Sequence, residues 1–229
     1  MEVVVIDKLA LKQLDTRCLY IIMHSNIGIF YYVNLENRAD RNDHIISQFA
    51  EYNITNYERI EAIQHEYGIL GCGLSHVKTI ETFLKSGHDV CVIMEDDFKF
   101  SLTKEECAKM FAEFFNTHTD CSCWDVVQLS ANTLDSAPYT DILDRCIRSF
   151  TTSGYMINRR FASDLLVNLL EGTKGLSETH DRALYSLDVY WNKLQAVSKW
   201  YVFKPKMGYQ IPSYSDIENA YVNYAYYGI

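Results

Sequence analysis

Three consecutive carboxylates, Glu95, Asp96 and Asp97, are the residues of this sequence whose type and spacing most favour chemistry. They directly follow the apolar run from Val90 to Met94, which is typical of a strand buried on both faces. Like charges at the end of a buried strand repel one another and lose solvation, so a compensating group is expected. Mg²⁺ and Mn²⁺ are suitable because both prefer carboxylate oxygens, often together with a substrate phosphate.

The position and alternation of these carboxylates suggest a division of roles. Ligands of open α/β sheets gather at the carboxyl ends of strands. In an extended segment, Glu95 and Asp97 point the same way and Asp96 points the opposite way. We therefore expect Glu95 and Asp97 to bind a metal, and Asp96 to brace the backbone or to contact a sugar. The alternative is a solvated turn, because acidic triplets are common.

Strand-like and helix-like stretches alternate along the chain, and this pattern predicts an α/β fold with a mostly parallel central sheet flanked by helices. We expect Asp40 to cap a helix, Gly87 to end another, and Thr103 and Glu106 to form a capping box. A later helix should end near Gly172. The strands expected from β-branched and apolar runs are 29–33, 90–94, 125–129, 151–157 and 200–203.

The composition is that of a single globular domain. The chain has 229 residues, 48% of them hydrophobic, with 30 acidic against 21 basic residues and a net charge of -9. That balance disfavours nucleic acid as a partner, because a nucleic-acid groove needs clustered Lys and Arg. It does not exclude a diphosphate site, since a bound divalent cation can supply the positive charge.

Cysteine usage and apolar runs favour a soluble cytoplasmic protein. Seven cysteines, odd in number and without a CxxC pair, fit reduced thiols better than a disulfide framework. The start from Met1 to Asp7 has no basic region and too short an apolar run for a signal peptide. The longest apolar stretch, Cys18 to Val33, is interrupted by polar residues 24–26, so no membrane span is expected.

Three segments carry a resemblance to a known family. The segment Asn34–Arg41 reads N-L-E-N-R-A-D-R, Gly68–His76 reads G-I-L-G-C-G-L-S-H, and Ile93–Asp97 reads I-M-E-D-D. In this order they resemble the N-L-x-x-R-x-D-R, G-E-L/I-G-C-x-L-S-H and L-E-D-D elements of glycosyltransferase family 25. That family holds bacterial lipopolysaccharide glycosyltransferases and collagen hydroxylysine galactosyltransferases.

Weaker matches extend the resemblance to most of the chain, from residue 29 to about 216. Trp124–Leu129 is similar to the family's W-D-x-V-x-L strand, and Leu187-Asp188 to its V-D pair. Gln210 and Ser215–Ile217 resemble its Q-x-x-x-x-S-D-I ending. Two features depart from the pattern: residues 1–28 have no clear counterpart, and the segment from Ile63 to Gly71 is much shorter than in the collagen enzymes.

The resemblance implies a GT-A fold and an inverting transfer of a hexose from a UDP-sugar to a hydroxyl of a glycan or hydroxylysine-type protein acceptor. Mn²⁺ or Mg²⁺ would clamp the donor diphosphate and stabilise the leaving UDP. The donor would lie among Asn34, Leu35, Arg41 and Ala62. Three further positions are implied to flank it: Gly71, whose turn lets backbone approach, and Ser75 and His76, which would open the following helix.

The acceptor hydroxyl needs a base, and the family analogy assigns this role to Asp188. Asp181, in a polar loop, is a second candidate for the base. Asp188 could instead cap a helix. Asp216 is a further candidate for a metal or sugar contact, or for a helix cap. Trp191, Trp200 and the tyrosines from Tyr209 to Tyr227 are candidates to stack on an acceptor sugar, although most are expected to be core and cover.

The expected organisation is an N-terminal extension of residues 1–28 followed by one GT-A domain, 29–229, with a Tyr-rich tail. Such a tail is also a candidate homodimer surface, since aromatic residues are enriched at interfaces. Two competing functions are a Mg²⁺-dependent nucleotidyltransferase or phosphatase and a non-catalytic glycan-binding or scaffold protein that retains the fold. The first should show a phosphate loop or a D-x-D nucleophile, and neither is evident. The intact Glu95–Asp97 run argues against the second.

Overall fold

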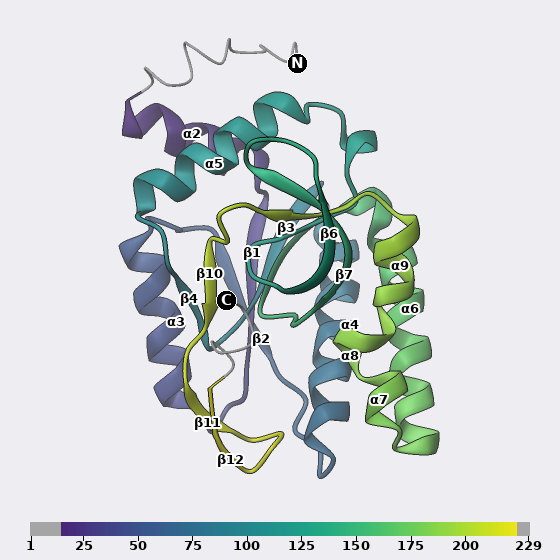
Figure 1. Cartoon of the computed structure of the whole chain (residues 1–229). Coiled ribbons are helices and arrows are strands. Elements are labelled where there is room, and N and C mark those ends of the chain that lie inside the picture. Colours follow the sequence, from purple (N-terminus) through teal and green to yellow (C-terminus); the bar gives the residue numbers. More distant parts are fainter. Residues whose placement is uncertain (1–14, 224–229) are drawn as a thin grey trace.

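A central sheet with the strand order β2-β1-β3-β8-β5-β9-β7-β6 organises the molecule in a computed structural model that describes residues 15–223 (Figure 1). Two further pairs lie outside it: β10 (Gly208–Gln210) with β4 (Phe98–Phe100), and β11 (Ser213–Ser215) with β12 (Ala220–Val222). The strands of the central sheet are β1 (Ile29–Asn34), β2 (Tyr57–Glu61), β3 (Val90–Glu95), β5 (Val126–Gln128), β6 (Asn132–Pro138), β7 (Leu143–Phe150), β8 (Gly154–Asn158) and β9 (Trp200–Phe203).

Most strands of the central sheet run in one direction. β1 pairs in parallel with β2 and β3, and β5 pairs in parallel with β9. β8 is antiparallel to β3 and β5, and β7 is antiparallel to β9 and β6. The predicted α/β fold is therefore confirmed, with β8 and β7 as the reversed strands of the sheet.

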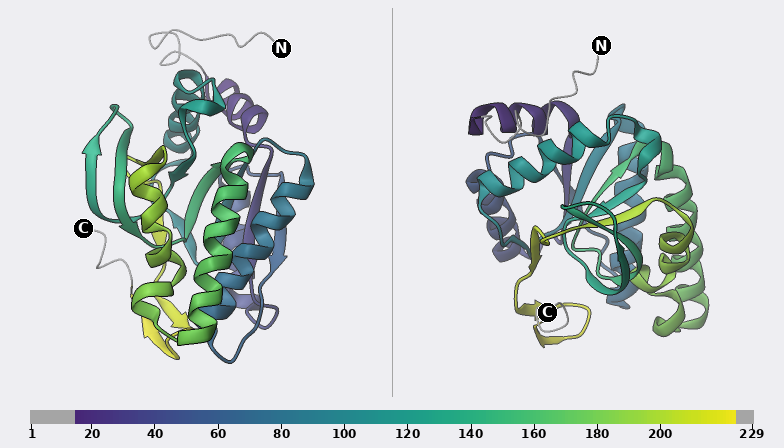
Figure 2. Two further views of the ribbon diagram at one scale, coloured as in Figure 1. Left: turned by 90° about the vertical axis from the view of Figure 1, so that its right-hand side faces the viewer. Right: turned by 45° about the horizontal axis from the view of Figure 1, so that its top comes forward.

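Helices cover both faces of the sheet (Figure 1, Figure 2). Side chains alternate along β1, so Phe30 and Tyr32 pack with α3 and α5, whereas Tyr31 and Val33 pack with α4 and α6. The helices are α2 (Thr16–Asn26), α3 (Ala39–Glu51), α4 (Gly68–Ser86), α5 (Lys104–Thr117), α6 (Arg159–Thr179), α7 (Arg182–Tyr185), α8 (Leu187–Tyr190) and α9 (Asn192–Val197), with a 3-10 turn at Cys121–Cys123.

Two predicted helix ends are confirmed. Gly87 ends α4 with φ of 81°, a left-handed conformation in which glycine carries no Cβ penalty. Thr103 and Glu106 form the reciprocal capping box that begins α5.

Three expectations about helices were wrong. Asp40 lies in the first turn of α3, because the helix starts two residues earlier than expected, with Arg38 at the cap position. Gly172 lies inside α6, which continues to Thr179 because further apolar positions, ending at Leu176, remain buried. Ser75 and His76 do not open their helix, since α4 already begins at Gly68.

The hairpin of β6 and β7 was not anticipated. It stands at one side of the molecule in the left view of Figure 2, at the edge of the sheet. β6 is polar and largely exposed, and the register shifts between β6 and β7 interrupt the pairing. The sequence therefore lacks the alternation of apolar and polar residues that predicts a strand. The strand expected at 151–157 begins only at Gly154, which leaves Thr151, Thr152 and Ser153 in a loop beside the end of β3.

The N-terminal extension is described from Asp15 onward, where α2 packs against α5. The start from Met1 to Asp7, and Tyr224, Tyr226 and Tyr227 of the tail, lie outside the described residues. Within 15–223, no helix is long and apolar enough to cross a membrane. Among the cysteines whose side chains the structure describes, Cys18, Cys72, Cys91, Cys107, Cys123 and Cys146 are free thiols.

Candidate functional site

A cavity of about 580 Å³ lies at the carboxyl ends of β1 and β3, a volume in the range of small-molecule sites. Parallel pairing of these strands, with Val33 opposite Glu95, brings Asn34 and the acidic run to the same edge of the sheet. The other walls include the loop 62–66 after β2, the start of α4, the loop before β8, the short helix α8 and the segment 210–219.

Glu95 and Asp97 converge on one side chain inside this cavity. The amide of Gln210 donates to Glu95 Oε2 at 3.0 Å and to Asp97 Oδ1 at 3.4 Å. Gln210 is placed there because β10 (Gly208–Gln210) pairs with β4 (Phe98–Phe100), the strand that follows the acidic run. Thr152 donates its hydroxyl to the other Glu95 oxygen, Oε1.

Asp96 points to the other side from Glu95 and Asp97, as expected, although residues 96 and 97 form a turn and not an extended segment. Its two oxygens accept from Asn34 Nδ2 at 2.8 Å and from Arg41 Nη1 at 3.1 Å. Arg41 Nη1 also lies 3.1 Å from Asp97 Oδ2, so one guanidinium serves both aspartates. Asn34 is fixed in turn by Arg59, whose Nε donates to Asn34 Oδ1 at 2.9 Å.

Carboxylates outnumber the positive charge that reaches them. Burial raises the pKa of Asp97 to about 7, the charge of Glu95 contributes to this rise, and Arg41 only partly opposes both. Burial likewise raises the pKa of Asp96. The pKa of Glu95 is lowered, although burial alone would raise it, because His76 and Thr152 stabilise the carboxylate.

These observations fit a hard divalent cation. Glu95 Oε2 and Asp97 Oδ1 share a single amide donor, and the raised pKa of Asp97 shows that a positive charge at this point would be stabilising. Mg²⁺ and Mn²⁺ favour such carboxylate oxygens. Glu95 and Asp97 are therefore the residues that would hold the ion.

Asp188 lies across the cavity, in the first turn of α8. It accepts a hydrogen bond from the backbone N–H of Thr151 at 3.0 Å, and burial raises its pKa. Thr151 has φ of 75°, a conformation that β-branched residues rarely adopt, and its hydroxyl donates to Gln210 Oε1 at 2.7 Å. Asp188 is thus joined to Gln210 through Thr151.

The two remaining acidic candidates lie in different surroundings. Asp181 is exposed at the start of α7 and is not among the residues that line the cavity. Asp216 does line the cavity, but it forms an ion pair with Arg38. The structure therefore brings Asp188 to the acidic run and leaves Asp181 outside.

The predicted donor-binding residues divide into cavity wall and support. Leu35, Ala62 and Ser75 line the cavity, whereas Gly71 supports it from behind. A Cβ on Gly71 would lie 2.5 Å from the carbonyl oxygen of Ile63, so the glycine permits close packing of α4 on this loop. Ser75 Oγ accepts from Ile63 N at 2.8 Å and donates to Gly71 O at 2.6 Å.

The C-terminal segment is tied over the cavity by two arginines at the start of α3. Arg41 Nη2 donates to Ser213 Oγ at 2.7 Å and to Tyr214 O at 2.9 Å. Arg38 donates to Tyr214 O at 3.1 Å. These bonds position β11 (Ser213–Ser215) and, through it, the wall that includes Asp216.

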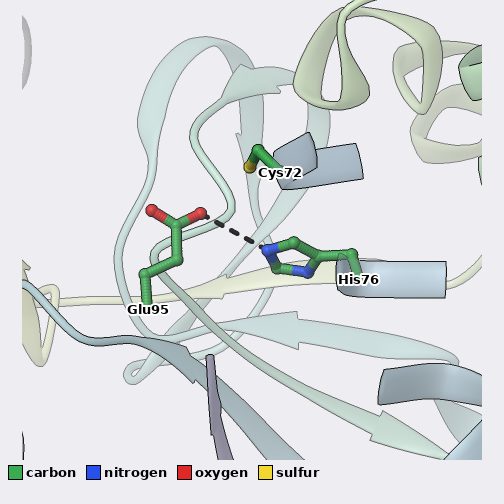
Figure 3. Close-up of side chains that lie close together, drawn as sticks. All are labelled: Cys72, His76 and Glu95. Carbon is green, nitrogen blue, oxygen red and sulfur yellow. Dashed lines mark ion pairs between the residues drawn. The ribbon is translucent and has the colours of Figure 1, made fainter. Parts of the chain in front are cut away.

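Sequence reasoning missed Cys72, Thr152 and Gln210 as parts of the acidic cluster. Cys72 and His76 are four residues apart on α4, so they face the same side of the helix and meet Glu95 (Figure 3). That i, i+4 spacing was a readable signal. Thr152 carried no such signal, and Gln210 was marked only by its place in the Q-x-x-x-x-S-D-I resemblance, because the approach of both depends on where β8 and β10 begin and end.

Comparison with known proteins assigns neither a family nor a function to this chain. No protein-family model matches the chain, and no curated protein matches it. Among solved structures, it is similar to A197 from STIV, at 14% identity and a TM-score of 0.43, with 76% of this chain and 80% of that chain covered. A glycosyltransferase involved in the glycosylation of the major capsid of PBCV-1 is similar at 9% identity and a TM-score of 0.44, with the same coverage. A mannose-1-phosphate geranyltransferase from Thermus thermophilus is similar at 8% identity and a TM-score of 0.44, covering 76% and 72% of the two chains. These identities and scores are too low to assign a family or a function.

Proposed function

We propose that the chain is a metal-dependent glycosyltransferase that moves a hexose from a UDP-sugar to a hydroxyl group. The observation that carries this proposal is the convergence of Glu95 and Asp97 on Gln210 at the carboxyl ends of parallel strands, inside a cavity of about 580 Å³. Two carboxylates with one shared donor suit a cation that in turn binds a diphosphate. The resemblance of the three sequence motifs to glycosyltransferase family 25 supports the same function.

Each wall of the cavity has a role in this proposal. Mn²⁺ or Mg²⁺, when bound, would neutralise the diphosphate and the charge of the leaving UDP. Glu95 and Asp97 would hold the ion, and Asp96 keeps Asn34 and Arg41 in place beside it. Leu35 and Ala62 line the part of the cavity next to the ends of β1 and β2, which we assign to the nucleoside.

Asp188 is the proposed general base. Its carboxylate is fixed by the Thr151 N–H, and its raised pKa increases its affinity for a proton. In an inverting transfer, Asp188 would accept the proton of the acceptor hydroxyl as that oxygen forms a bond to the anomeric carbon. The bond from that carbon to the UDP oxygen breaks, and UDP leaves from the opposite face. The acceptor is proposed to be a glycan or a hydroxylysine-type protein.

The experiment is a panel of UDP-sugars assayed for UDP release and transfer, with and without Mn²⁺, and with UDP binding measured by calorimetry. Asp97→Asn should abolish Mn²⁺-dependent UDP binding. Asp188→Asn should retain binding and lower transfer by about 10²–10⁴-fold, the usual contribution of a general base. Asp181→Asn, at an exposed position, is the matched control and should retain both.

Three results would count against the proposal. Absence of Mn²⁺-dependent UDP release from every donor, in a folded protein, would favour a glycan-binding or scaffold protein that retains the fold. Transfer that survives Asp188→Asn would remove Asp188 as the base. An NMR spectrum of the product that shows the donor's anomeric configuration would rule out inversion.

A further inference from the structure

The two carboxylate oxygens of Glu95 face different surroundings. Oε2 receives the Gln210 amide and lies on the side of Asp97. Oε1 accepts the Thr152 hydroxyl and lies 3.5 Å from His76 Nε2. Oε2 of Glu95 therefore faces Asp97 and Gln210, and Oε1 faces side chains that project from α4.

That second group contains three different ligand atoms. The Cys72 sulfur, a ring nitrogen of His76 and a Glu95 oxygen all lie within 4.8 Å of one another (Figure 3). Cys72 and His76 are fixed relative to each other because both project from one side of α4. Glu95 meets them from the end of β3.

His76 has a buried polar atom without a hydrogen-bond partner. The side chain is 1% exposed, and its Nε2 makes no hydrogen bond to any residue in 15–223. The 3.5 Å separation from Glu95 Oε1 exceeds the normal length of an N–H···O bond. A buried polar atom of this kind is costly to leave unpaired, so its orientation toward Cys72 and Glu95 calls for a ligand.

The other nitrogen of the ring is already held. His76 Nδ1 lies 3.0 Å from the hydroxyl of Tyr155, whose side chain is buried on β8. When a metal ion replaces the proton that Nε2 directs at Glu95, Nδ1 carries the remaining proton and donates it to the tyrosine oxygen, and the lone pair of Nε2 is directed at the ion. Histidines that bind metals show this arrangement, with one nitrogen on the ion and the other on an outer hydrogen-bond partner.

We propose that Cys72, His76 and Glu95 form a binding site for Zn²⁺. Thiolate sulfur, imidazole nitrogen and carboxylate oxygen are the donor types that this ion takes. Ligand atoms about 2.0–2.3 Å from a tetrahedral zinc ion are roughly 3.2–3.8 Å apart, and the His76 to Glu95 distance of 3.5 Å already satisfies this. Rotation of the Cys72 side chain would complete the set, and binding releases the thiol proton to solvent.

Three protein ligands leave a fourth position on the ion for water or a ligand, on the cavity side, because all three residues line the cavity. Thr152 holds Glu95 Oε1 and Tyr155 holds His76, so both ligands have an outer partner. The proposal does not require sugar transfer. It also leaves Glu95 Oε2 and Asp97 for the harder cation.

Cobalt is the probe for this site, because Co²⁺ replaces Zn²⁺ and reports its ligands by colour. Protein stripped with EDTA would be titrated with Co²⁺ and then with Zn²⁺. We expect a sulfur-to-cobalt charge-transfer band in the near ultraviolet, intense visible bands of a tetrahedral ion, and loss of both when Zn²⁺ is added.

Variants identify the ligands. Cys72→Ala should remove the charge-transfer band and weaken Zn²⁺ binding by more than about 100-fold, beyond the 10–100-fold typical of an outer partner. His76→Gln should weaken binding similarly. Cys123→Ala, at an exposed free thiol outside the cavity, is the matched control and should leave the spectrum unchanged.

Different results would contradict the zinc site and the proposed transferase activity. Asp97→Asn should keep the sulfur-to-cobalt band while losing Mn²⁺-dependent UDP binding. A wild-type Co²⁺ complex with only weak octahedral bands and no charge-transfer band would overturn the zinc proposal, and this test needs no variant to fold. A band that persists in Cys72→Ala would overturn it as well.

Discussion

Asp96 and Asp97 are neighbours in one turn, yet they belong to two different polar regions. On the Asp96 side, Asn34, Arg41 and Arg59 form a chain of hydrogen bonds that fills both carboxylate oxygens. On the Asp97 side, the carboxylates of Asp97 and Glu95 share the single amide of Gln210, and Asp97 shares the Arg41 guanidinium with Asp96. Both Asp96 oxygens thus have a side-chain hydrogen-bond donor, whereas the second region holds two neighbouring carboxylates for one shared amide and one shared guanidinium.

This difference indicates that the Asp96 region stabilises the fold and that the Asp97 region binds a ligand. A buried charge whose partners are all present stabilises one conformation of the protein, whereas a buried charge short of partners is stabilised further by a ligand. The unpartnered Nε2 of His76 and the raised pKa of Asp188 lie on the same side as Asp97. We therefore expect substitutions to affect folding on the Asp96 side and ligand binding on the Asp97 side.

The largest effect should come from Arg41, the residue shared by both regions. Arg41→Met leaves Asp96 and Asp97 buried without their common guanidinium, and such losses cost about 3–5 kcal/mol. Urea unfolding would measure the change in the free energy of unfolding. Lys174→Met is the control, because Lys174 and its partner Glu178 are 75% and 64% exposed, and such a pair should contribute no more than about 1 kcal/mol. Equal losses in the two variants would contradict the shared role of Arg41.

Matched substitutions of the two aspartates should affect the free energy of unfolding differently. Asp96→Asn weakens charged hydrogen bonds from Asn34 and Arg41 and should lower the free energy of unfolding by about 2 kcal/mol. Asp97→Asn relieves repulsion with Glu95 and should leave stability unchanged or raise it in the presence of EDTA.

The pH dependence of unfolding gives a second readout for the same pair. The pKa of Asp97 is about 7 in the folded chain, above the value of 3.8 that an unperturbed aspartate has. The unfolded state therefore releases this proton first, and wild-type stability should fall as pH rises toward and through 7. Asp97→Asn should lack this loss, as measured by urea unfolding from pH 4 to 8. Parallel curves for the two proteins would contradict the assigned charge balance.

Much of the fold was predictable because it depends on local signals. The apolar run before Glu95, the capping box at Thr103 and the glycine at Gly87 each act within one element, and each is where the sequence places it. Asp96 does pair with Asn34 while Glu95 and Asp97 share Gln210, as expected, but residues 96 and 97 form a turn rather than the extended strand on which that expectation rested.

The partners of the acidic run were not predictable, because they come from distant segments. Gln210 reaches Glu95 only through the pairing of β10 with β4, and Thr152 does so because β8 starts late. Asp181 and Asp188 are equally polar candidates in sequence, and only the short helices α7 and α8 place one outside the cavity and one inside. Which of the two aspartates lies in the cavity depends on tertiary packing, and local sequence patterns do not predict it.

The glycine behind the cavity should have an intermediate effect. Gly71→Ala places a Cβ 2.5 Å from the Ile63 carbonyl oxygen, which belongs to the backbone and moves only with its loop. We expect a loss of about 1–3 kcal/mol in the free energy of unfolding. Gly172→Ala is a matched control inside α6, because its Cβ would meet the Tyr190 side chain at 3.1 Å or more. The control should be less destabilised in thermal unfolding, and the reverse order would contradict this account of Gly71.

The smallest effect should come from His118, a buried titratable residue away from the cavity. Burial lowers its pKa, although a contact with the Phe114 carbonyl opposes the shift, and its ring stacks on Phe114. The unfolded state therefore gains a proton first as pH falls, so this residue favours folding above about pH 6.5 and loses that contribution below it. Its pH dependence thus has the opposite sign to that of Asp97. His118→Phe keeps a ring and removes this contribution, so its unfolding free energy relative to wild type should increase between pH 7 and 5, measured by urea unfolding. A difference between the two proteins that stays constant over this range would contradict this role of His118.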